Sequence, residues 1–549
     1  MNVTHLRGRR ATDRSNRVSM GDMFERIRWH DPDRVVMTFW EGAYESADLK
    51  ELTAQLADDT ANQYAQAILS TGIEPGSIVM LVCENSAEAI LTKIGLAKAG
   101  VTVAPVNPNL GSDVIEELIK LCEPRGVVVD SENLEKIEPL LQRHGIPVLH
   151  QIAVGTTAPG HRSFAQFIAG HPSSEPDVEI HGDDIWQLLF TSGSTSTPKG
   201  VMVSHINTMF SALSFNGIGM NGVAYESDFC MISFLPIVYH VGDGVVYNAV
   251  LSGGRAVIGR RFNPQAVAQA IHRDAVTCLW AGAPQALDAI CTEFEAHPEL
   301  SPQSLRTIIF GWAPMSPELH ARSKRVLGEQ TKCIEIIGQT EVVCAHRFWI
   351  DKHQDLFDRT APRENYVGQP HELLAAMIAD KDGNPIPAGS DVVGEAAYRS
   401  PALMAGYYKK PKETAEALRN NWFFGGDAFK WGESGQRILA DRFKDIVKTG
   451  GENVTSIRVE AAINLFPGVH KTAIVGLPHE RWGEAVTAFV VAKPGFKLSE
   501  PELIAFAKNH LANFEIPKKV VVVDQLPETV GGKVQKHKLR AQYHDLYQG

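Results

Sequence analysis

Short apolar runs alternate with helical patterns along the first part of the chain. Apolar runs of strand length occupy residues 77–82, 101–106 and 126–130. Between them, residues 87–99 and 114–121 space their apolar side chains as amphipathic helices do, and the first of these segments ends at a glycine. Strand, helix and strand in this order predict a parallel sheet covered by helices.

This alternation stops near residue 440, where the charged segment DRFKD at 441–445 intervenes. Residues 471–476 and 485–492 are then expected to be strands. Residues 499–511 are expected to form a helix that begins with a capping box, a serine followed three residues later by a glutamate. The fold class is therefore α/β, with a large N-terminal domain of parallel or mixed sheets covered by helices and a small mobile α+β C-terminal domain. The expected bounds are residues 1–440 for the large domain, 441–445 for a hinge and 446–549 for the small domain.

Composition agrees with a soluble enzyme of more than one domain. The chain has 549 residues, of which 44% are hydrophobic and 21% charged. The net charge of −11 indicates no nucleic-acid partner. The seven cysteines form no CxxC pair and stand in apolar contexts, which predicts reduced thiols in a cytoplasmic protein. No apolar run reaches transmembrane length. The basic N-terminus lacks the hydrophobic core of a secretory signal. We therefore interpret it as a frayed arm, with a transit peptide as the alternative.

The segment TSGSTSTPKG at 191–200 follows an apolar run, residues 185–190, that predicts a buried strand. Six serine and threonine residues precede Pro198-Lys199. Backbone N–H groups and hydroxyls of such a loop can surround phosphate oxygens, and the lysine adds a positive charge. The same composition suits a solvated linker, and the loop alone does not separate the two interpretations. The Walker pattern GxxxxGK[ST] is absent.

This loop resembles the phosphate loop TSGTTGxPKG of the adenylate-forming superfamily, which includes acyl-CoA synthetases, aryl-CoA ligases and firefly luciferase. Ser194 replaces a threonine, and Ser196 stands where a glycine is usual. The resemblance implies that the loop and its lysine hold the polyphosphate of ATP through Thr191, Ser192, Gly193, Ser194, Thr195, Ser196 and Lys199.

Two further strand ends resemble the same family. RTIIFGWAPM at 306–315 is similar to the GGAP loop, with Trp312 in place of a glycine, and IEIIGQTE at 334–341 is similar to YGxTE. Glu341 is the implied Mg²⁺ ligand, together with Thr191, because a hard cation prefers oxygen ligands. The implied ATP and AMP contacts in these two segments are Trp312, Ala313, Pro314, Glu335, Ile336, Ile337, Gly338, Gln339 and Thr340.

Residues 394–460 carry the densest resemblance. Asp427 occupies the place of the ribose-binding acid, since a carboxylate accepts from both hydroxyls, and Arg442 that of the second ribose contact. Lys444 matches the family's hinge residue. The implied neighbours of the pantetheine arm of coenzyme A are Lys448, Gly450 and Gly451.

Three positions in the last third depart from the family pattern. Asp441 replaces a usual glycine, Ser456 a usual proline, and Lys536 the last arginine of PxxxxGKxxR. In that same closing motif Lys533 matches the catalytic lysine.

LPIVYHVGDG at 235–244 resembles the family's aromatic-His element, and the resemblance implies catalytic roles for His240, Lys199 and Lys533. Relatives that activate amino acids carry an aspartate near the position of His240. A histidine here argues against an α-amino acid. The apolar stretches 238–250, 277–285 and 336–345 contain no lysine or arginine for a second carboxylate. A hydrophobic acid, whether fatty, aryl or polycyclic, is therefore expected.

The resemblance implies an acyl-CoA synthetase that uses ATP, Mg²⁺ and coenzyme A and passes through an acyl-adenylate. An adenylating enzyme that loads a separate carrier protein remains an alternative, as does a non-catalytic nucleotide-binding relative. An oligomer is possible.

Overall fold

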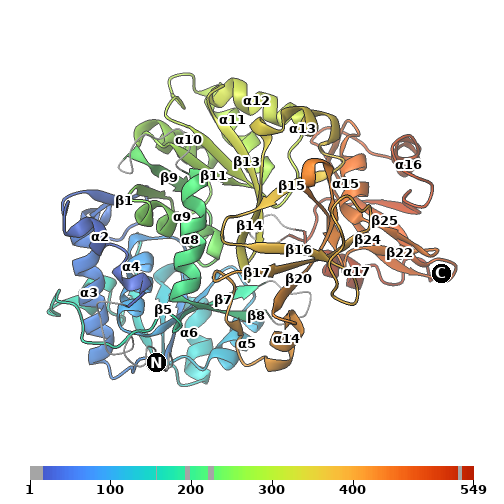
Figure 1. Cartoon of the computed structure of the whole chain (residues 1–549). Helices are drawn as coiled ribbons and strands as arrows, with labels where there is room; N and C mark the ends of the chain where they lie inside the picture. The colour runs from blue at the N-terminus through green and yellow to red at the C-terminus, as the bar shows by residue number, and fades with distance from the viewer. Residues whose placement is uncertain (1–16, 156–157, 192–197, 220–227, 529–533, 549) are drawn as a thin grey trace, which may run out of the picture.

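The computed structural model describes residues 17–155, 158–191, 198–219, 228–528 and 534–548. Within these ranges the strands form two large sheets and one small sheet, and the small sheet is built from the C-terminal part of the chain (Figure 1). In the same ranges no helix is long and apolar enough to cross a membrane.

The first sheet contains the parallel strands predicted for the start of the chain. β3 lies between β4 and β5, all in parallel, while the β7–β8 hairpin continues the sheet in antiparallel pairing. In spatial order its strands are β18 (Gly406–Tyr407), β8 (Lys199–Ser204), β7 (Ile185–Thr191), β4 (Thr102–Val106), β3 (Ile78–Val82), β5 (Gly126–Asp130) and β6 (Val148–Ile152).

The second sheet has a parallel half and an antiparallel half. The parallel half comprises β1 (Val35–Phe39), β10 (Arg255–Ile258), β9 (Cys230–Ser233), β11 (Cys278–Gly282), β12 (Thr307–Phe310) and β13 (Lys332–Gln339), with β2 (Glu51–Thr53) antiparallel at the edge. The antiparallel half comprises β14 (Val342–Trp349), β15 (Asn365–Pro370), β21 (Arg437–Arg442), β20 (Trp422–Trp431), β17 (Gly394–Arg399), β16 (Ala375–Ala379) and β19 (Leu418–Arg419).

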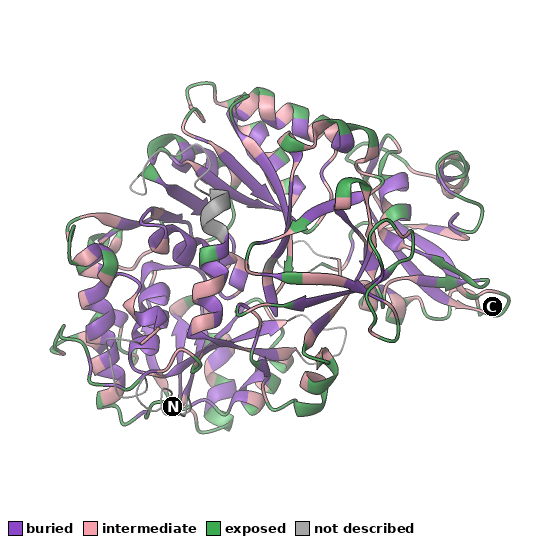
Figure 2. Ribbon diagram, in the orientation of Figure 1, coloured by how far each residue is buried: buried purple, intermediate pink, exposed green. Residues whose placement is uncertain are grey.

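Helices form a shared layer between the two large sheets and cover their outer faces. One continuous apolar cluster joins both sheets through α3 (Ala54–Ser70), α4 (Ala87–Lys98), α8 (His205–Gly219) and α9 (His240–Leu251), and the buried colour of Figure 2 runs through this layer. The outer helices are α5 (Ser112–Cys122) and α6 (Leu134–Arg143) on the first sheet and α10 (Pro264–Arg273), α11 (Pro284–Ala296) and α12 (Pro317–Leu327) on the second. The shorter helices are α2 (Glu25–Arg28), α7 (Phe164–Ile168), α13 (Gln354–Thr360) and α14 (Pro411–Ala417).

The amphipathic character expected for residues 87–99 is wrong. Every residue of α4 is buried, because the helix lies in the layer between the sheets. Its charged side chains have buried partners instead of water: Lys93 Nζ lies 2.6 Å from Asp243, and Lys98 Nζ lies 2.9 Å from Asp58. Unpaired charges could not occupy such positions.

The small domain packs helices on both faces of its sheet. The sheet consists of β22 (Val447–Thr449), β23 (Glu452–Val454), β24 (Val469–His479), β25 (Gly483–Ala492) and β26 (Lys519–Val522). α15 (Ser456–Asn464) and α16 (Glu500–Lys508) share one apolar cluster with this sheet, and α17 (Lys536–Gln542) shares another.

The predicted capping box is wrong, although α16 does begin after Ser499. The Ser499 side chain makes no hydrogen bond to the backbone of the first turn. Its hydroxyl donates to the Glu502 carboxylate at 2.6 Å, so the two side chains satisfy each other.

Candidate active site

The β7–β8 hairpin positions the lysine of the expected phosphate loop. Thr191, half-buried at the end of β7, pairs with Lys199 at the start of β8, while Ser192, Gly193, Ser194, Thr195 and Ser196 lie outside the described residues. The Lys199 ammonium lies 4.6 Å from the centroid of the Tyr407 ring. A cation over an aromatic face is attracted by the ring's negative quadrupole, so Tyr407 holds Lys199 in place.

Tyr407 also binds the expected metal ligand. Its hydroxyl donates to Glu341 Oε1 at 2.8 Å, and burial, followed by the charge of Glu341, raises the pKa of Tyr407. The phenol is therefore a neutral donor near pH 7. Lys199, Tyr407 and Glu341 form one cluster drawn from three distant segments. Of these three side chains, the Glu341 carboxylate offers the oxygen ligand that Mg²⁺ prefers, so Glu341 would hold the ion and the residue fits the implied metal.

The expected ribose contacts meet on neighbouring strands. Asp427 on β20 pairs in register with Arg442 on β21, and Arg442 Nε lies 2.6 Å from Asp427 Oδ1. The Gln339 amide, from the end of β13, donates to the other Asp427 oxygen and, at 3.2 Å, to the Gly425 carbonyl. The acid, the arginine and the glutamine are thus brought together.

Trp312 adopts a backbone conformation that favours glycine. Its φ is +67° and its side chain is 43% exposed. The indole lies edge-on to Trp280, with ring centroids 6.0 Å apart, and a Cβ added to Gly282 would stand 3.0 Å from it. A tryptophan therefore adopts a left-handed backbone conformation that favours glycine, at a cost in strain. The side chain is exposed, so it is not a core residue.

The other expected contacts on these strand ends differ in exposure. Glu335 and Ile336 are buried, while Gly338 is exposed and Ala313, Pro314, Ile337 and Thr340 are intermediate. Burial raises the pKa of Glu335 to about 8, and its carboxyl is hydrogen-bonded by Asn365. Its side chain is thus engaged inside the protein, which leaves its backbone as the part that can meet a nucleotide.

His240 is the first residue of α9 and is 6% exposed. Burial lowers its pKa, so the imidazole is neutral near pH 7. Its Nδ1 has no hydrogen-bond partner among the described residues.

The loop that leads to His240 is held by side chains from the β3–α4 connection and from α4 itself. Asn85 donates to the Leu235 carbonyl at 2.9 Å and accepts from the Ile237 N–H at 2.8 Å. Lys93 Nζ donates to the Ile237 carbonyl at 3.2 Å and to Asp243 at 2.6 Å. This loop is therefore rigidly positioned.

The expected pantetheine contacts lie on the β22–β23 turn. Lys448, Gly450 and Gly451 are exposed, and the two glycines have φ of +60° and +90°. A Cβ on Gly451 would meet no atom within 4 Å, so the turn presents bare backbone. Lys444 follows β21 at the surface. Lys533 lies outside the described residues.

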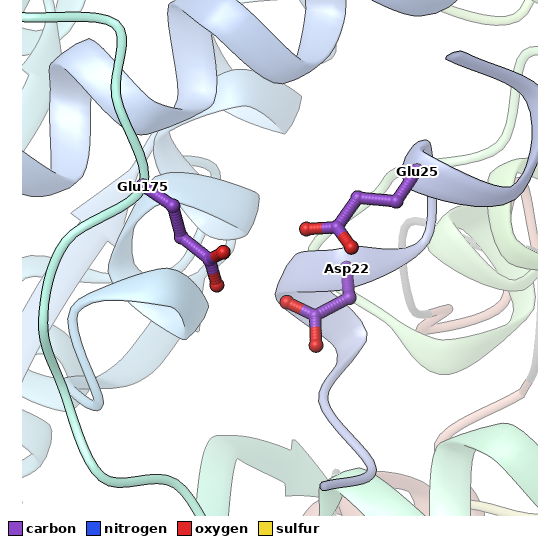
Figure 3. Close-up of side chains that lie close together, drawn as sticks. All are labelled: Asp22, Glu25 and Glu175. Carbon is purple, nitrogen blue, oxygen red and sulfur yellow. The ribbon is translucent and has the colours of Figure 1, made fainter. Parts of the chain in front are cut away.

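In the described part of the chain, one cluster of three acidic side chains is spaced as metal ligands are, but basic side chains bind these carboxylates. Asp22, Glu25 and Glu175 bring carboxylate oxygens within 4.8 Å of one another (Figure 3). Arg17 forms ion pairs with Asp22 and Glu175, and Lys98 lies 3.5 Å from Glu25. Cations of the chain already balance these charges.

Reasoning from the sequence did not single out Tyr407, Asn85 or Lys93. Tyr407 stands in the run MAGYYKK, within the segment 394–460 that resembles the family, but its partners Lys199 and Glu341 are far away along the chain. Lys93 is a charged residue in an apolar run, which was the available signal, whereas Asn85 stands between Glu84 and Ser86, where nothing marks it.

Two enzyme-family models match most of this chain. The AMP-binding enzyme family model matches residues 24–408, and the AMP-binding enzyme C-terminal domain model matches residues 458–533. A feruloyl-CoA synthase from Amycolatopsis sp is 28% identical over 485 residues, which cover 87% of this chain and 91% of that protein. The medium-chain fatty-acid–CoA ligase of Escherichia coli is 28% identical over 535 residues, covering 95% and 90%.

Among solved structures, ATP-bound MatB from Rhodopseudomonas palustris is similar with a TM-score of 0.82 and 27% identity, covering 96% of this chain and 99% of that one. Apo MatB, at the same coverage, has a TM-score of 0.71 and 26% identity.

Proposed function

Because this chain belongs to the family of AMP-binding enzymes, we propose that it activates a hydrophobic carboxylic acid with ATP and then forms the thioester with coenzyme A. In the first step a carboxylate oxygen attacks the α-phosphorus, and the bond to the pyrophosphate oxygen breaks. In the second step the thiol of coenzyme A attacks the acyl carbon, loses its proton, and AMP departs.

The cluster of Lys199, Tyr407 and Glu341 is the observation that carries this proposal. The substrate carboxylate and the triphosphate are both anions, so the first step needs positive charge to offset their repulsion. Lys199 supplies one charge, and its position over Tyr407 fixes where that charge lies. Mg²⁺, held by Glu341, supplies further charge when bound. Asp427 and Arg442 would orient the ribose.

The acid itself is proposed to be apolar. Asp243, which stands in the stretch 238–250, is bound by Lys93 at 2.6 Å and accepts from the Tyr247 hydroxyl at 3.0 Å. Both bonds go to Oδ2, and the Lys93 ammonium already balances the charge of this buried carboxylate, so Asp243 would not pair with an ammonium of the substrate. Trp280 donates its indole N–H to the Val241 carbonyl at 2.9 Å, so its ring presents only apolar surface.

The two steps are proposed to use opposite faces of the small domain. Lys533 would meet the carboxylate and the α-phosphate in the first orientation. After rotation at Lys444, the turn with Lys448, Gly450 and Gly451 would lie against the pantetheine arm. The strand bounds support this, because Lys444 lies between strands: β21 of the second sheet ends at Arg442, and β22 of the small sheet begins at Val447.

Pyrophosphate exchange over a panel of acids tests the first step. Hydrophobic acids should drive exchange of labelled pyrophosphate into ATP. Glu341→Gln keeps an acceptor for Tyr407 but removes the charge, so it should slow exchange by about 100-fold and raise the Mg²⁺ requirement. Glu372→Gln, at a mostly exposed carboxylate paired with Arg347, is the control. Failure of every acid to support exchange would contradict the proposal.

A further inference from the structure

Two of the departures from the family pattern meet in one hydrogen bond. Asp441, at the end of β21, is 2% exposed. One carboxylate oxygen accepts the backbone N–H of Arg442 at 2.8 Å, and the other accepts the backbone N–H of Ser456, the first residue of α15. The usual glycine and proline could not form this bond, because glycine has no carboxylate and proline has no N–H.

The third departure joins the same network. Lys536, the first residue of α17, donates to the Ser456 hydroxyl and lies 2.7 Å from Glu460 Oε1. Burial alone would lower the pKa of Lys536, but the charges of Glu460, Asp441 and Asp445 outweigh it and raise the pKa. The ammonium is therefore charged; it contacts Glu460 directly and is also attracted by the charge of Asp441, on the other side of the proposed hinge.

A second cation of α17 binds the hinge segment directly. Arg540 lies 2.7 Å from Asp445 Oδ1 and donates to the Lys444 carbonyl at 3.3 Å. α17 thus contacts the hinge segment at Lys444 and Asp445 through Arg540.

We propose that Asp441, Ser456 and Lys536 form a latch that holds the small domain in the adenylating orientation, with Asp441 as its positioning residue. Asp441 precedes Lys444, whereas Ser456 and Lys536 follow it. Rotation at Lys444 changes the direction of the Ser456 N–H relative to the Asp441 carboxylate, and a hydrogen bond weakens steeply when it is misaligned. The higher similarity to ATP-bound than to apo MatB supports assigning the latched orientation to the ATP step.

The expected effect of the latch on the half-reactions depends on the proposed function. The hydrogen bond that forms the latch does not. Asp441→Gly and Ser456→Pro each remove one partner of the bond. Proline is favoured at the first position of a helix, so Ser456→Pro should leave α15 intact. Asp441→Asn keeps an acceptor for Ser456 and removes only the charge that faces Lys536. Glu433→Gln, which breaks the exposed pair with Arg359, is the matched control.

The experiment measures both half-reactions and hydrogen–deuterium exchange in the full-length protein. Asp441→Gly and Ser456→Pro should each slow pyrophosphate exchange on the order of tenfold, since bonds to charged groups are the stronger ones. Thioester formation from pre-made acyl-adenylate should stay within about twofold of the parent. The double variant should be no slower than the slower single variant, because both changes remove one bond.

Deuterium uptake at the start of α15 should be faster in Asp441→Gly than in the parent and in Glu433→Gln. For Asp441→Asn, both the rate of pyrophosphate exchange and the deuterium uptake at the start of α15 should lie between those of the parent and of Asp441→Gly. Equal losses in the two half-reactions, multiplying losses in the double variant, or unchanged deuterium uptake would each overturn the latch. If the parent itself exchanges no pyrophosphate, the proposed function fails, while deuterium uptake still decides whether the bond holds α15.

Discussion

Replacing Trp312 with glycine tests whether this residue is a strained wall of the substrate site or part of the core. The structure places an exposed indole on a backbone with φ of +67°, against Trp280 and Gly282. Glycine adopts this φ without steric cost. Trp312→Gly therefore removes strain and an aromatic contact at the same time.

The two effects on stability are of similar size and opposite sign. A left-handed conformation costs a residue with a Cβ about 1–2 kcal/mol. The edge contact with Trp280 is worth about 0.5–1.5 kcal/mol. The free energy of unfolding should therefore change by about −0.5 to +1.5 kcal/mol, whereas truncating a buried tryptophan lowers it by about 3–5 kcal/mol.

Chemical denaturation and steady-state kinetics provide the assay. The glycine variant should change the preference among acids, or the KM for ATP, by several-fold, because the indole beside Gly282 is removed. Trp312→Ala is the control: it loses the same contact but keeps a Cβ at positive φ, so it should be about 1 kcal/mol less stable than Trp312→Gly. A loss of about 3–5 kcal/mol with unchanged kinetics would refute the reasoning.

Three further predictions concern the half-reactions, substrate charge and pH. Lys533→Ala should slow adenylation by about two to three decades and spare thioester formation from pre-made acyl-adenylate, and Gly451→Leu should do the reverse; equal losses in both variants would contradict domain alternation. Because Lys93 and Tyr247 already bind Asp243, α-amino acids should be poor substrates, and pyrophosphate exchange with any of them at the rate of a hydrophobic acid would contradict this. Burial lowers the pKa of His205 from 6.5 to about 3, so the stability it contributes is complete above pH 6.5 and is lost as the pH falls toward 3. Between pH 8 and pH 5, the free energy of unfolding measured in urea should therefore fall by about 2 kcal/mol less in His205→Asn than in the parent. An identical pH dependence of the two proteins would contradict this.

The local pattern of apolar and polar residues predicted strands and helices well where their burial depends on neighbours close in the sequence. The expected strands at 77–82, 101–106 and 126–130 became β3, β4 and β5 in the predicted parallel arrangement. α4 was different, because its burial depends on a second sheet formed by residues far along the chain. Periodicity within a segment carries no information about such a partner.

The sequence predicted candidate residues of the site that lie within one segment, but not the contacts between segments far apart in the chain. Trp312 was recognisable as a departure from the GGAP pattern, but its positive φ required the structure. The contact of Tyr407 with both Lys199 and Glu341 could not be foreseen, since it depends on how β18 pairs with β8. Likewise, Asp441 and Ser456 were recognisable as departures, but their hydrogen bond required the structure.

The central claim, that this chain makes a coenzyme A thioester through an acyl-adenylate, is tested most directly by product analysis in a single reaction. The protein is incubated with MgATP and a hydrophobic acid that supports pyrophosphate exchange, with coenzyme A or with an acyl carrier protein, and the products are identified by mass spectrometry. If the claim holds, the products are the acyl-CoA thioester together with equimolar AMP and pyrophosphate. An acylated carrier protein without acyl-CoA, or ADP and phosphate in place of AMP, would contradict it.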